Sequence, residues 1–266
     1  MSRLQDRFVA LHGKRAALVT YVTGGDPHPQ MTVPLLHALV EAGADVLEVG
    51  IPFSDPMADG PVIQASHQRA LAHGVTLAQV LGMVAAFREQ DTRTPVVLMG
   101  YVNPVEAMGY TAFAQACRDH GVDGVILVDM PPEEAGDWVT AARQSGIDRV
   151  FLLAPTSPPE RMALVDTVSS GFVYYVALKG VTGAGHLDIA HVAERLAVVR
   201  RHMHLPVGVG FGVQDAESAR ALGAAADAVI VGSALIRRLT AHDNANIVSE
   251  ACAFVAGLKA ALPSRR

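Results

Sequence analysis

Two acidic residues, Glu48 and Asp59, have the types and the spacing that a proton-transfer site needs. Glu48 interrupts the apolar run Val46–Ile51, which has the composition of a buried strand. An ionised carboxylate is costly to bury without a partner, so burial favours a carboxyl group with a raised pKa. Asp59 follows 11 positions later, in a loop rich in Pro and Asp. This arrangement can place two carboxyl groups on the two sides of one small ligand.

A structural interpretation competes with this catalytic one. In it, Glu48 pairs with a backbone N–H group and Asp59 caps a turn of the loop. Either acid alone would favour the structural interpretation, so the choice depends on what the rest of the chain places around the pair.

The composition favours one well-buried α/β domain that covers residues 1–266. The chain is 50% hydrophobic and 18% charged, and barrels of about 250 residues commonly form one domain. A net charge of −5, with 5% aromatic residues and no basic run, argues against a nucleic-acid partner. Cys117 and Cys252 form no CxxC motif or disulfide framework. The chain shows no signal peptide and no apolar run of about 18 residues, so we expect a cytoplasmic protein without a membrane segment.

Strand-like apolar runs alternate with helical patterns along the whole chain. The eight predicted strands are Ala16–Gly24, Val46–Phe53, Val96–Tyr101, Gly124–Met130, Arg149–Ala154, Phe172–Leu178, Val207–Gly212 and Ala228–Gly232. The predicted helices are Ser2–Lys14, Met31–Ala42, Val62–Ala72, Leu77–Gln90, Thr111–His120, Glu133–Ser145, Pro159–Val168, Ile189–His202, Ala216–Gly223, Ala234–Leu239 and Asn246–Ala261. Strands rich in Val, Ile and Leu indicate a parallel sheet with both faces covered. Eight such units predict a (β/α)8 TIM barrel with an extra N-terminal helix, and an open doubly wound sheet is the alternative.

Three Gly-rich segments follow the last three predicted strands: Gly180–Gly183, Gly210–Gly212 and Gly232-Ser233. Backbone without side chains lets N–H groups approach an anion closely. Ser233 can cap the short helix Ala234–Leu239, whose N-terminus attracts a phosphate. The loops after strands seven and eight are the usual phosphate site of this barrel, so we predict phosphate binding there. No GxGxxG or GxxxxGK[ST] motif supports a dinucleotide or P-loop site.

The segment LEVGIPFSDPMADGPVIQ, at residues 47–64, carries a specific family resemblance. With YVTGGDP before it and GVTGA, GVGFG and VGSA after it, the chain resembles the tryptophan synthase alpha subunit family over essentially its whole length. The resemblance implies a carbon–carbon lyase that cleaves indole-3-glycerol phosphate to indole and glyceraldehyde 3-phosphate. It also implies Glu48 and Asp59 as the two catalytic carboxylates.

Other functional positions of the family carry over to this sequence. The resemblance places substrate-binding residues at Tyr21, Met99, Tyr101, Ile126, Asp129, Leu152, Tyr174 and Thr182. It places phosphate-binding residues at Gly183, Phe211, Gly212, Gly232 and Ser233.

The resemblance also implies a protein partner. Alpha subunits of this family work with a beta subunit that uses pyridoxal phosphate, in an assembly of two alpha and two beta chains, and pass it indole for tryptophan biosynthesis. No cofactor or metal is expected in this chain itself. The resemblance places the partner interface at Pro52, Asp55, Pro56, Asn103 and Pro104.

The chemistry of such a cleavage agrees with the two acids. It needs a proton delivered to indole carbon 3, a proton removed from the glycerol hydroxyl, and stabilisation of charge at the ring nitrogen. We predict that Glu48, in its apolar surroundings, moves the protons and that the Asp59 carboxylate faces the ring N–H.

Two other functions remain open from the residues alone. Lys179, one of three lysines, ends the sixth predicted strand, where a Schiff-base aldolase could place its lysine. A non-catalytic subunit that only activates a partner is the second alternative, and the presence of both acids argues against it. The 11 histidines are scattered. The pairs His186 and His191, and His202 and His204, lack a nearby acid or Cys at metal-ligand spacing, so we predict surface histidines.

Overall fold

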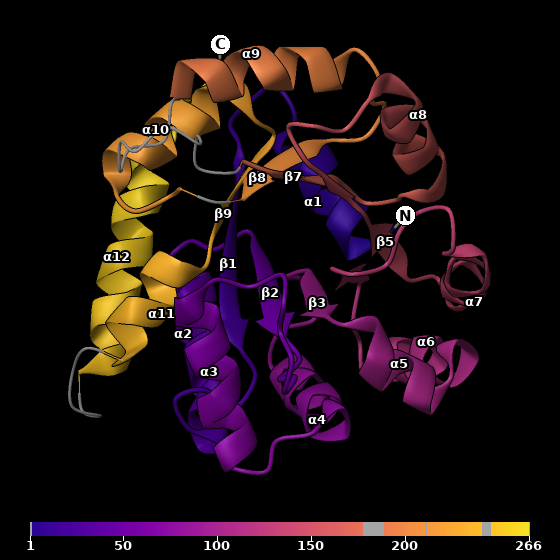
Figure 1. The fold of residues 1–266 in the computed structure, drawn as a ribbon. Helices are drawn as coiled ribbons and strands as arrows, with labels where there is room; N and C mark the ends of the chain where they lie inside the picture. Colours follow the sequence, from indigo (N-terminus) through magenta and orange to yellow (C-terminus); the bar gives the residue numbers. More distant parts are fainter. Residues whose placement is uncertain (1, 178–188, 211, 241–245, 266) are drawn as a thin grey trace.

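A ring of strands lies inside a ring of helices (Figure 1). The structure is a computed structural model that describes residues 2–177, 189–210, 212–240 and 246–265. Its strands are β1 (Ala17–Thr23), β2 (Val46–Gly50), β3 (Val96–Gly100), β4 (Gly124–Leu127), β5 (Asp148–Val150), β6 (Leu152–Leu153), β7 (Val173–Val176), β8 (Val207–Gly210) and β9 (Ala228–Val231). All paired strands are parallel, in the order β5-β4-β3-β2-β1-β9-β8-β7-β6.

The two ends of this strand order are halves of one strand. β5 pairs with β4, β6 pairs with β7, and only Phe151 separates β5 from β6. The Phe151 carbonyl still accepts a hydrogen bond from the Tyr174 N–H group at 3.0 Å. The sheet therefore closes on itself, which confirms the predicted barrel over the open sheet. The predicted fifth strand, Arg149–Ala154, contains the break.

The helices surround the barrel much as predicted. They are α1 (Arg3–Leu11), α2 (Thr32–Glu41), α3 (Pro61–Ala72), α4 (Leu77–Arg88), α5 (Val102–Met108), α6 (Tyr110–Asp119), α7 (Gly136–Ser145), α8 (Pro159–Val168), α9 (Ile189–Arg200), α10 (Ala216–Ala225), α11 (Ser233–Thr240) and α12 (Ile247–Ala261), with the 3-10 helix η1 (Pro29–Met31). Helix α5 was not predicted from the sequence. Its Asn103-Pro104 pair resembles a turn, but a proline in the first helical turn removes no intrahelical hydrogen bond.

Within the described ranges, no single helix is long and apolar enough to cross a bilayer. Only α3 and α4 taken together pass a test of length and composition, and they are bent by 94° relative to each other.

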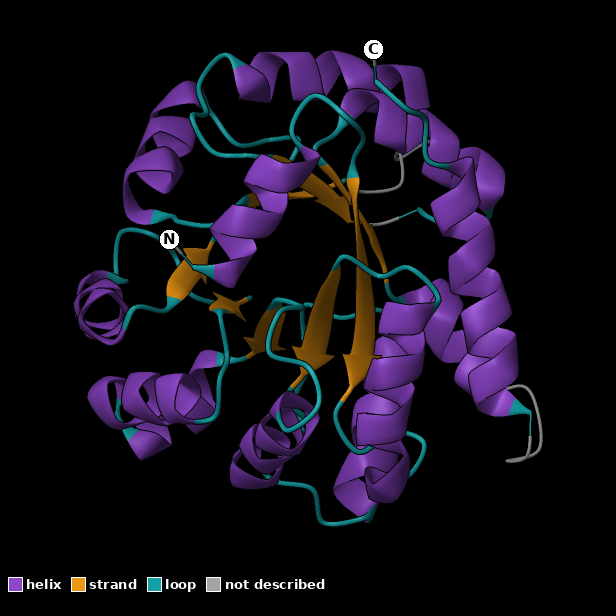
Figure 2. Ribbon diagram, turned by 180° about the vertical axis from the view of Figure 1, so that it is seen from behind, coloured by secondary structure: helices purple, strands orange, loops and turns teal. Residues whose placement is uncertain are grey.

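The barrel interior is filled with apolar side chains and closed at one end by α1. Inward-facing Val19, Val46 and Val97 form one buried cluster with Leu4 and Phe8 of α1. In Figure 2 the helix beside the N label, which is α1, lies across the end of the barrel. The predicted extra N-terminal helix is therefore present, and it seals the amino-terminal end of the strands.

Aspartate side chains link neighbouring strands at this sealed end. An aspartate stands at the start of four strands: Asp45 before β2, Asp123 before β4, Asp148 at the start of β5, and Asp227 before β9. Three of these carboxylates accept a hydrogen bond from the first residues of a neighbouring strand. The donors are the N–H groups of Leu18 to Asp45 at 2.9 Å, Val96 to Asp123 at 2.8 Å and Val207 to Asp227 at 3.0 Å.

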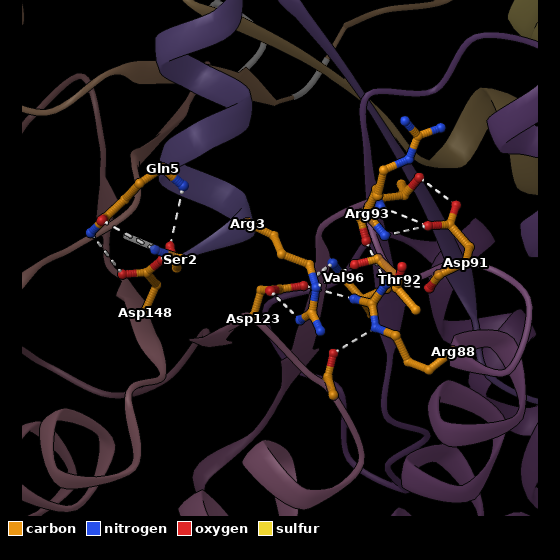
Figure 3. A network of polar contacts seen from close by, with 12 residues as sticks. Ser2, Arg3, Gln5, Arg88, Asp91, Thr92, Arg93, Val96, Asp123 and Asp148 are labelled. Atoms are coloured by element: carbon orange, nitrogen blue, oxygen red, sulfur yellow. Dashed lines mark hydrogen bonds and ion pairs between the residues drawn. The ribbon is translucent and has the colours of Figure 1, made fainter.

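Two of these aspartates, Asp123 and Asp148, also hold α1 in place (Figure 3). Asp123, whose side chain is 3% exposed, accepts from Arg88 at 2.7 Å and from Arg3 of α1 at 2.8 Å. At the start of α1, the Ser2 hydroxyl donates to Asp148. Buried carboxylates therefore join α1, which we call the plug helix, to the barrel.

We predict that Asp123→Ala destabilises the fold by about 3 kcal/mol or more, because it leaves the mostly buried Arg88 guanidinium without its carboxylate. Arg88 is 10% exposed in its side chain. The free energy of unfolding, from urea titration, measures the loss. Asp119→Ala is the control, because the Arg118–Asp119 ion pair is 54% and 60% exposed and such pairs contribute about 0–1 kcal/mol. Equal losses in the two variants would contradict the prediction.

Candidate active site

A cavity of about 310 Å³ opens at the carboxyl ends of the strands, opposite α1. Eight of the residues predicted for the site line it: Tyr21, Glu48, Asp59, Met99, Tyr174, Gly212, Gly232 and Ser233. Residues from β1, β2, β3 and β7 thus meet residues of three loops, as the closed parallel sheet requires.

Glu48 reaches the cavity because side chains alternate along a strand. Val46 faces the barrel interior, so Glu48, two residues later, points to the same side one layer nearer the opening. Met99 on β3 and Tyr174 on β7 reach the cavity by the same alternation. The layer of side chains that contains Glu48, Met99 and Tyr174 therefore lies next to the apolar layer that contains Val46.

The Glu48 carboxyl group is buried without a hydrogen-bond partner among the described residues. The residue is 1% exposed, and neither side-chain oxygen contacts a donor there. Burial, and then the nearby charge of Asp59, raise the pKa of Glu48 to about 8. Glu48 is thus mainly protonated at pH 7, and the predicted backbone-paired alternative does not describe it.

Asp59 lies in the same cavity but has a donor. The Tyr101 hydroxyl donates to Asp59 Oδ2 at 2.8 Å, and the Asp59 side chain is 4% exposed. Burial raises the pKa of Asp59, and the bond from Tyr101 opposes that rise. Since only one of the two acids has a donor for its charged form, the shared environment places the proton on Glu48 and the charge on Asp59.

Two tyrosines that line the cavity need glycine beside them. A Cβ atom at Gly50 would overlap the Tyr21 phenol oxygen, and one at Gly210 would overlap that of Tyr174. Gly210 was predicted from the sequence to belong to a phosphate loop, and that role stays a prediction. In the structure its missing side chain makes room for the Tyr174 ring.

The N-terminus of α11 forms another wall of the cavity. The Gly232 carbonyl accepts from the N–H groups of Leu235 at 2.9 Å and Ile236 at 3.0 Å, so those of Ser233 and Ala234 have no partner within the helix. The helix begins at Ser233, one residue earlier than predicted, so Ser233 belongs to its first turn rather than capping it. These free N–H groups can bind an anion.

A positive charge at this wall was not predicted from the sequence. Exposed Arg237, one turn after Ser233, lines the cavity. The helical spacing of four positions from Ser233 would have placed it on the same face.

Several predicted residues lie beside the cavity rather than in its lining. Tyr101 contacts Asp59, Ile126 is buried in the barrel interior, and Leu152 packs against the same interior cluster. Exposed Asp129 accepts a hydrogen bond from the Val102 N–H group at 2.9 Å. Their roles toward a substrate stay predictions. Thr182, Gly183 and Phe211, with the alternative candidate Lys179, fall outside the described residues.

The predicted interface residues lie on the loop after β2 and in the first turn of α5. Asp55 and Asn103 are exposed, whereas Pro56 and Pro104 are half-buried and Pro52 is buried. Pro52 can therefore shape the loop from within but offers little surface to a partner. Met57 in the same loop is 83% exposed.

A buried histidine also escaped the sequence analysis, which expected surface histidines. His67 on α3 is 2% exposed, and its Nε2 atom lies 3.2 Å from the Tyr21 phenol oxygen and 4.0 Å from Asp59 Oδ2. In the structure Ser66, His67 and Ala70 form the buried face of α3. Within the described ranges, no group of three His, Cys, Asp or Glu side chains could hold a metal ion.

Comparisons with known proteins agree on one family. The family model for the tryptophan synthase alpha chain matches residues 9–263. The tryptophan synthase alpha chain of Laribacter hongkongensis is 56% identical over 263 residues, which cover 98% of this chain and 99% of that protein. That of Thioalkalivibrio sulfidiphilus is 60% identical over 244 residues, covering 91% and 92%. The crystal structure of tryptophan synthase subunit alpha from Legionella pneumophila superposes with a TM-score of 0.91 at 41% identity, covering 98% of each chain.

We predict that Glu48→Gln flattens the pH dependence of stability between pH 4.5 and 8. A carboxyl group whose pKa rises from 4.5 to about 8 on folding stabilises the folded state fully below pH 4.5, and this contribution is lost as the pH rises toward 8. The slope reaches at most about 1.4 kcal/mol per pH unit. Urea unfolding at successive pH values should show wild type losing stability relative to the variant. Parallel curves would contradict the raised pKa.

Proposed function

The chain belongs to the tryptophan synthase alpha chain family, and we propose that it cleaves indole-3-glycerol phosphate to indole and glyceraldehyde 3-phosphate. The observation that carries the proposal is the pair of acids in one cavity, a buried Glu48 that has no hydrogen-bond partner among the described residues and an Asp59 held by Tyr101. Their unequal environments suit a reaction that needs both a proton donor and a fixed negative charge.

Glu48 moves the protons in this mechanism. Its protonated form delivers a proton to carbon 3 of the indole ring, and its carboxylate then removes the proton of the glycerol hydroxyl. The oxygen forms the aldehyde carbonyl as the carbon–carbon bond breaks, and the electrons of that bond return to the ring. The proton lost by the hydroxyl balances the one gained by carbon 3, so Glu48 ends as it began.

Asp59 stabilises the charge that develops during this transfer. Protonation of carbon 3 makes the ring nitrogen positive, and a carboxylate facing the ring N–H lowers the energy of that state. The Tyr101 bond fixes the carboxylate in place before the reaction starts. Apolar Met99, Ile63 and Ile230 line the same cavity and suit the faces of the indole ring.

The phosphate of the substrate fits the α11 end of the cavity. Ser233 and Ala234, whose N–H groups have no partner within the helix, and Arg237 all line the cavity there. An anion held at that end leaves the ring end near Glu48 and Asp59. This chain requires no cofactor for the proposed reaction.

The proposed partner is a beta chain, in an assembly of two alpha and two beta chains. The structure of a tryptophan synthase from M. tuberculosis is known in an aminoacrylate-bound form. Its matching chain is 36% identical to this one and superposes with a TM-score of 0.88. The exposed loop with Asp55 and Met57 leads directly into Asp59, so a partner that covers this loop also acts on the site. Pyridoxal phosphate would belong to that partner, and both chains would work in the cytoplasm.

We predict that Glu48→Gln lowers kcat for indole release by at least about 100-fold, because Gln keeps the size but cannot exchange protons. Indole is measured after adding indole-3-glycerol phosphate to the purified chain, alone and with a beta chain, which should raise the rate. Glu41→Gln, at an exposed position of α2, is the control and should keep wild-type turnover. Near-normal turnover by Glu48→Gln would refute the role of Glu48, and no indole from wild type in either condition would refute the function.

We also predict that Arg237→Gln raises KM by about 5-fold with little change in kcat, because an exposed guanidinium strengthens phosphate binding equally before and during the reaction. Arg238→Gln is the matched control. The Arg238 guanidinium lies 3.5 Å from the centre of the Phe254 ring and does not line the cavity. An equal rise of KM in both variants would remove Arg237 from the phosphate site.

A further inference from the structure

We propose that His67 is a positioning residue that fixes the Tyr21 phenol and the loop carrying Asp59 for the reaction, an inference that rests on the proposed function. His67 projects from α3 between β1 and that loop, where it is 2% exposed. Its ring contacts both neighbours through different nitrogen atoms. The direction of the surrounding hydrogen bonds determines which nitrogen carries the proton.

A chain of hydroxyl groups leads up to His67. The Ser66 hydroxyl donates to the Ile63 carbonyl at 2.7 Å, so its oxygen must accept from the Thr23 hydroxyl at 2.6 Å. With its proton used, Thr23 accepts from the Tyr21 hydroxyl at 3.1 Å. Each hydroxyl has one proton to donate, so the Tyr21 oxygen can only accept from His67.

One neutral tautomer of His67 satisfies both of its neighbours. Nδ1 accepts from the Phe53 N–H group at 3.1 Å and therefore carries no proton. The ring proton is on Nε2, which donates to the Tyr21 oxygen at 3.2 Å. Burial lowers the pKa of His67 to about 4, which keeps this neutral form at pH 7.

This tautomer joins three parts of the active site. It holds β1 through Tyr21, and it holds the loop backbone through Phe53, six residues before Asp59. Its Nε2–H group also lies 4.0 Å from Asp59 Oδ2, the oxygen that Tyr101 binds from its own side. Among the described residues Asp59 Oδ1 has no hydrogen bond, so it is the oxygen left for the indole N–H group. A displaced His67 would move Asp59 without removing any group that contacts the substrate.

The test compares His67→Ala with His67→Asn in the indole-release assay. We expect His67→Ala to lower kcat by about 30- to 100-fold while KM changes less than about 3-fold, because a misplacement of about 1 Å costs up to about 100-fold in rate. The Asn oxygen takes the place of Nδ1 and can still accept from Phe53, but the side chain is too short to reach Tyr21. His67→Asn should therefore recover part of the rate. His73→Ala, at the exposed end of the same helix, should leave both constants unchanged.

An active wild type with unchanged kcat in His67→Ala would overturn this proposal alone, whereas an inactive wild type would refute the proposed function. Loss of fold in both variants, seen by circular dichroism, would make His67 a purely structural residue and also overturn it. Long-range ¹H–¹⁵N NMR of wild type at pH 7 gives a second measurement that needs no turnover. The His67 signal, assigned by its absence from His67→Asn, should show a proton on Nε2 alone, and a proton on Nδ1 would overturn the proposal.

Discussion

Closure of a parallel sheet turns every second side chain of each strand into the barrel, where polar groups need partners. This constraint shapes the whole molecule. Apolar side chains such as Val19, Val46 and Val97 fill the barrel interior at the amino-terminal end of the strands, and α1 seals this end with Leu4 and Phe8. The same alternation, continued by one step, carries side chains into the cavity at the other end. The site therefore depends on the register of the strands and on the plug beneath it.

Acidic residues at the two ends of the barrel differ in their hydrogen-bond partners. At the sealed end, carboxylates bind backbone N–H groups and guanidinium groups, and so fasten strands, helices and α1 together. At the open end, Glu48 lacks any such partner in the described part of the chain, and Asp59 has only neutral neighbours in Tyr101 and His67. Stability is thus concentrated at one end, and the reactive groups stand at the other.

Sequence patterns predicted the barrel, the plug helix and the gathering of Glu48, Asp59 and the α11 loop. These follow from periodicity and from the meeting of strand ends, which are local rules applied to a closed sheet. The break at Phe151 was not predictable, because it reflects pairing with different strands on its two sides. His67 was missed because its function lies in contacts with residues 14 and 46 positions away in the chain, Phe53 and Tyr21. The aspartates before the strands were missed for the same reason, since their partners come from neighbouring strands and from helices that are distant in the sequence.

Asp45 and Glu48 show how hydrogen-bond donors can outweigh the effect of burial on the pKa of a carboxyl group. Asp45 directly precedes β2, Glu48 is the central residue of that strand, and both are almost fully buried. Burial alone raises the pKa of Asp45, but bonds from Arg15 and Lys259 and from the Leu18 N–H group outweigh it and hold the pKa below its usual value. Among the described residues Glu48 experiences the burial without such donors, so its pKa rises to about 8. The proposed proton transfer thus depends on a carboxyl group that lacks, within the described part of the chain, the donors that Asp45 has.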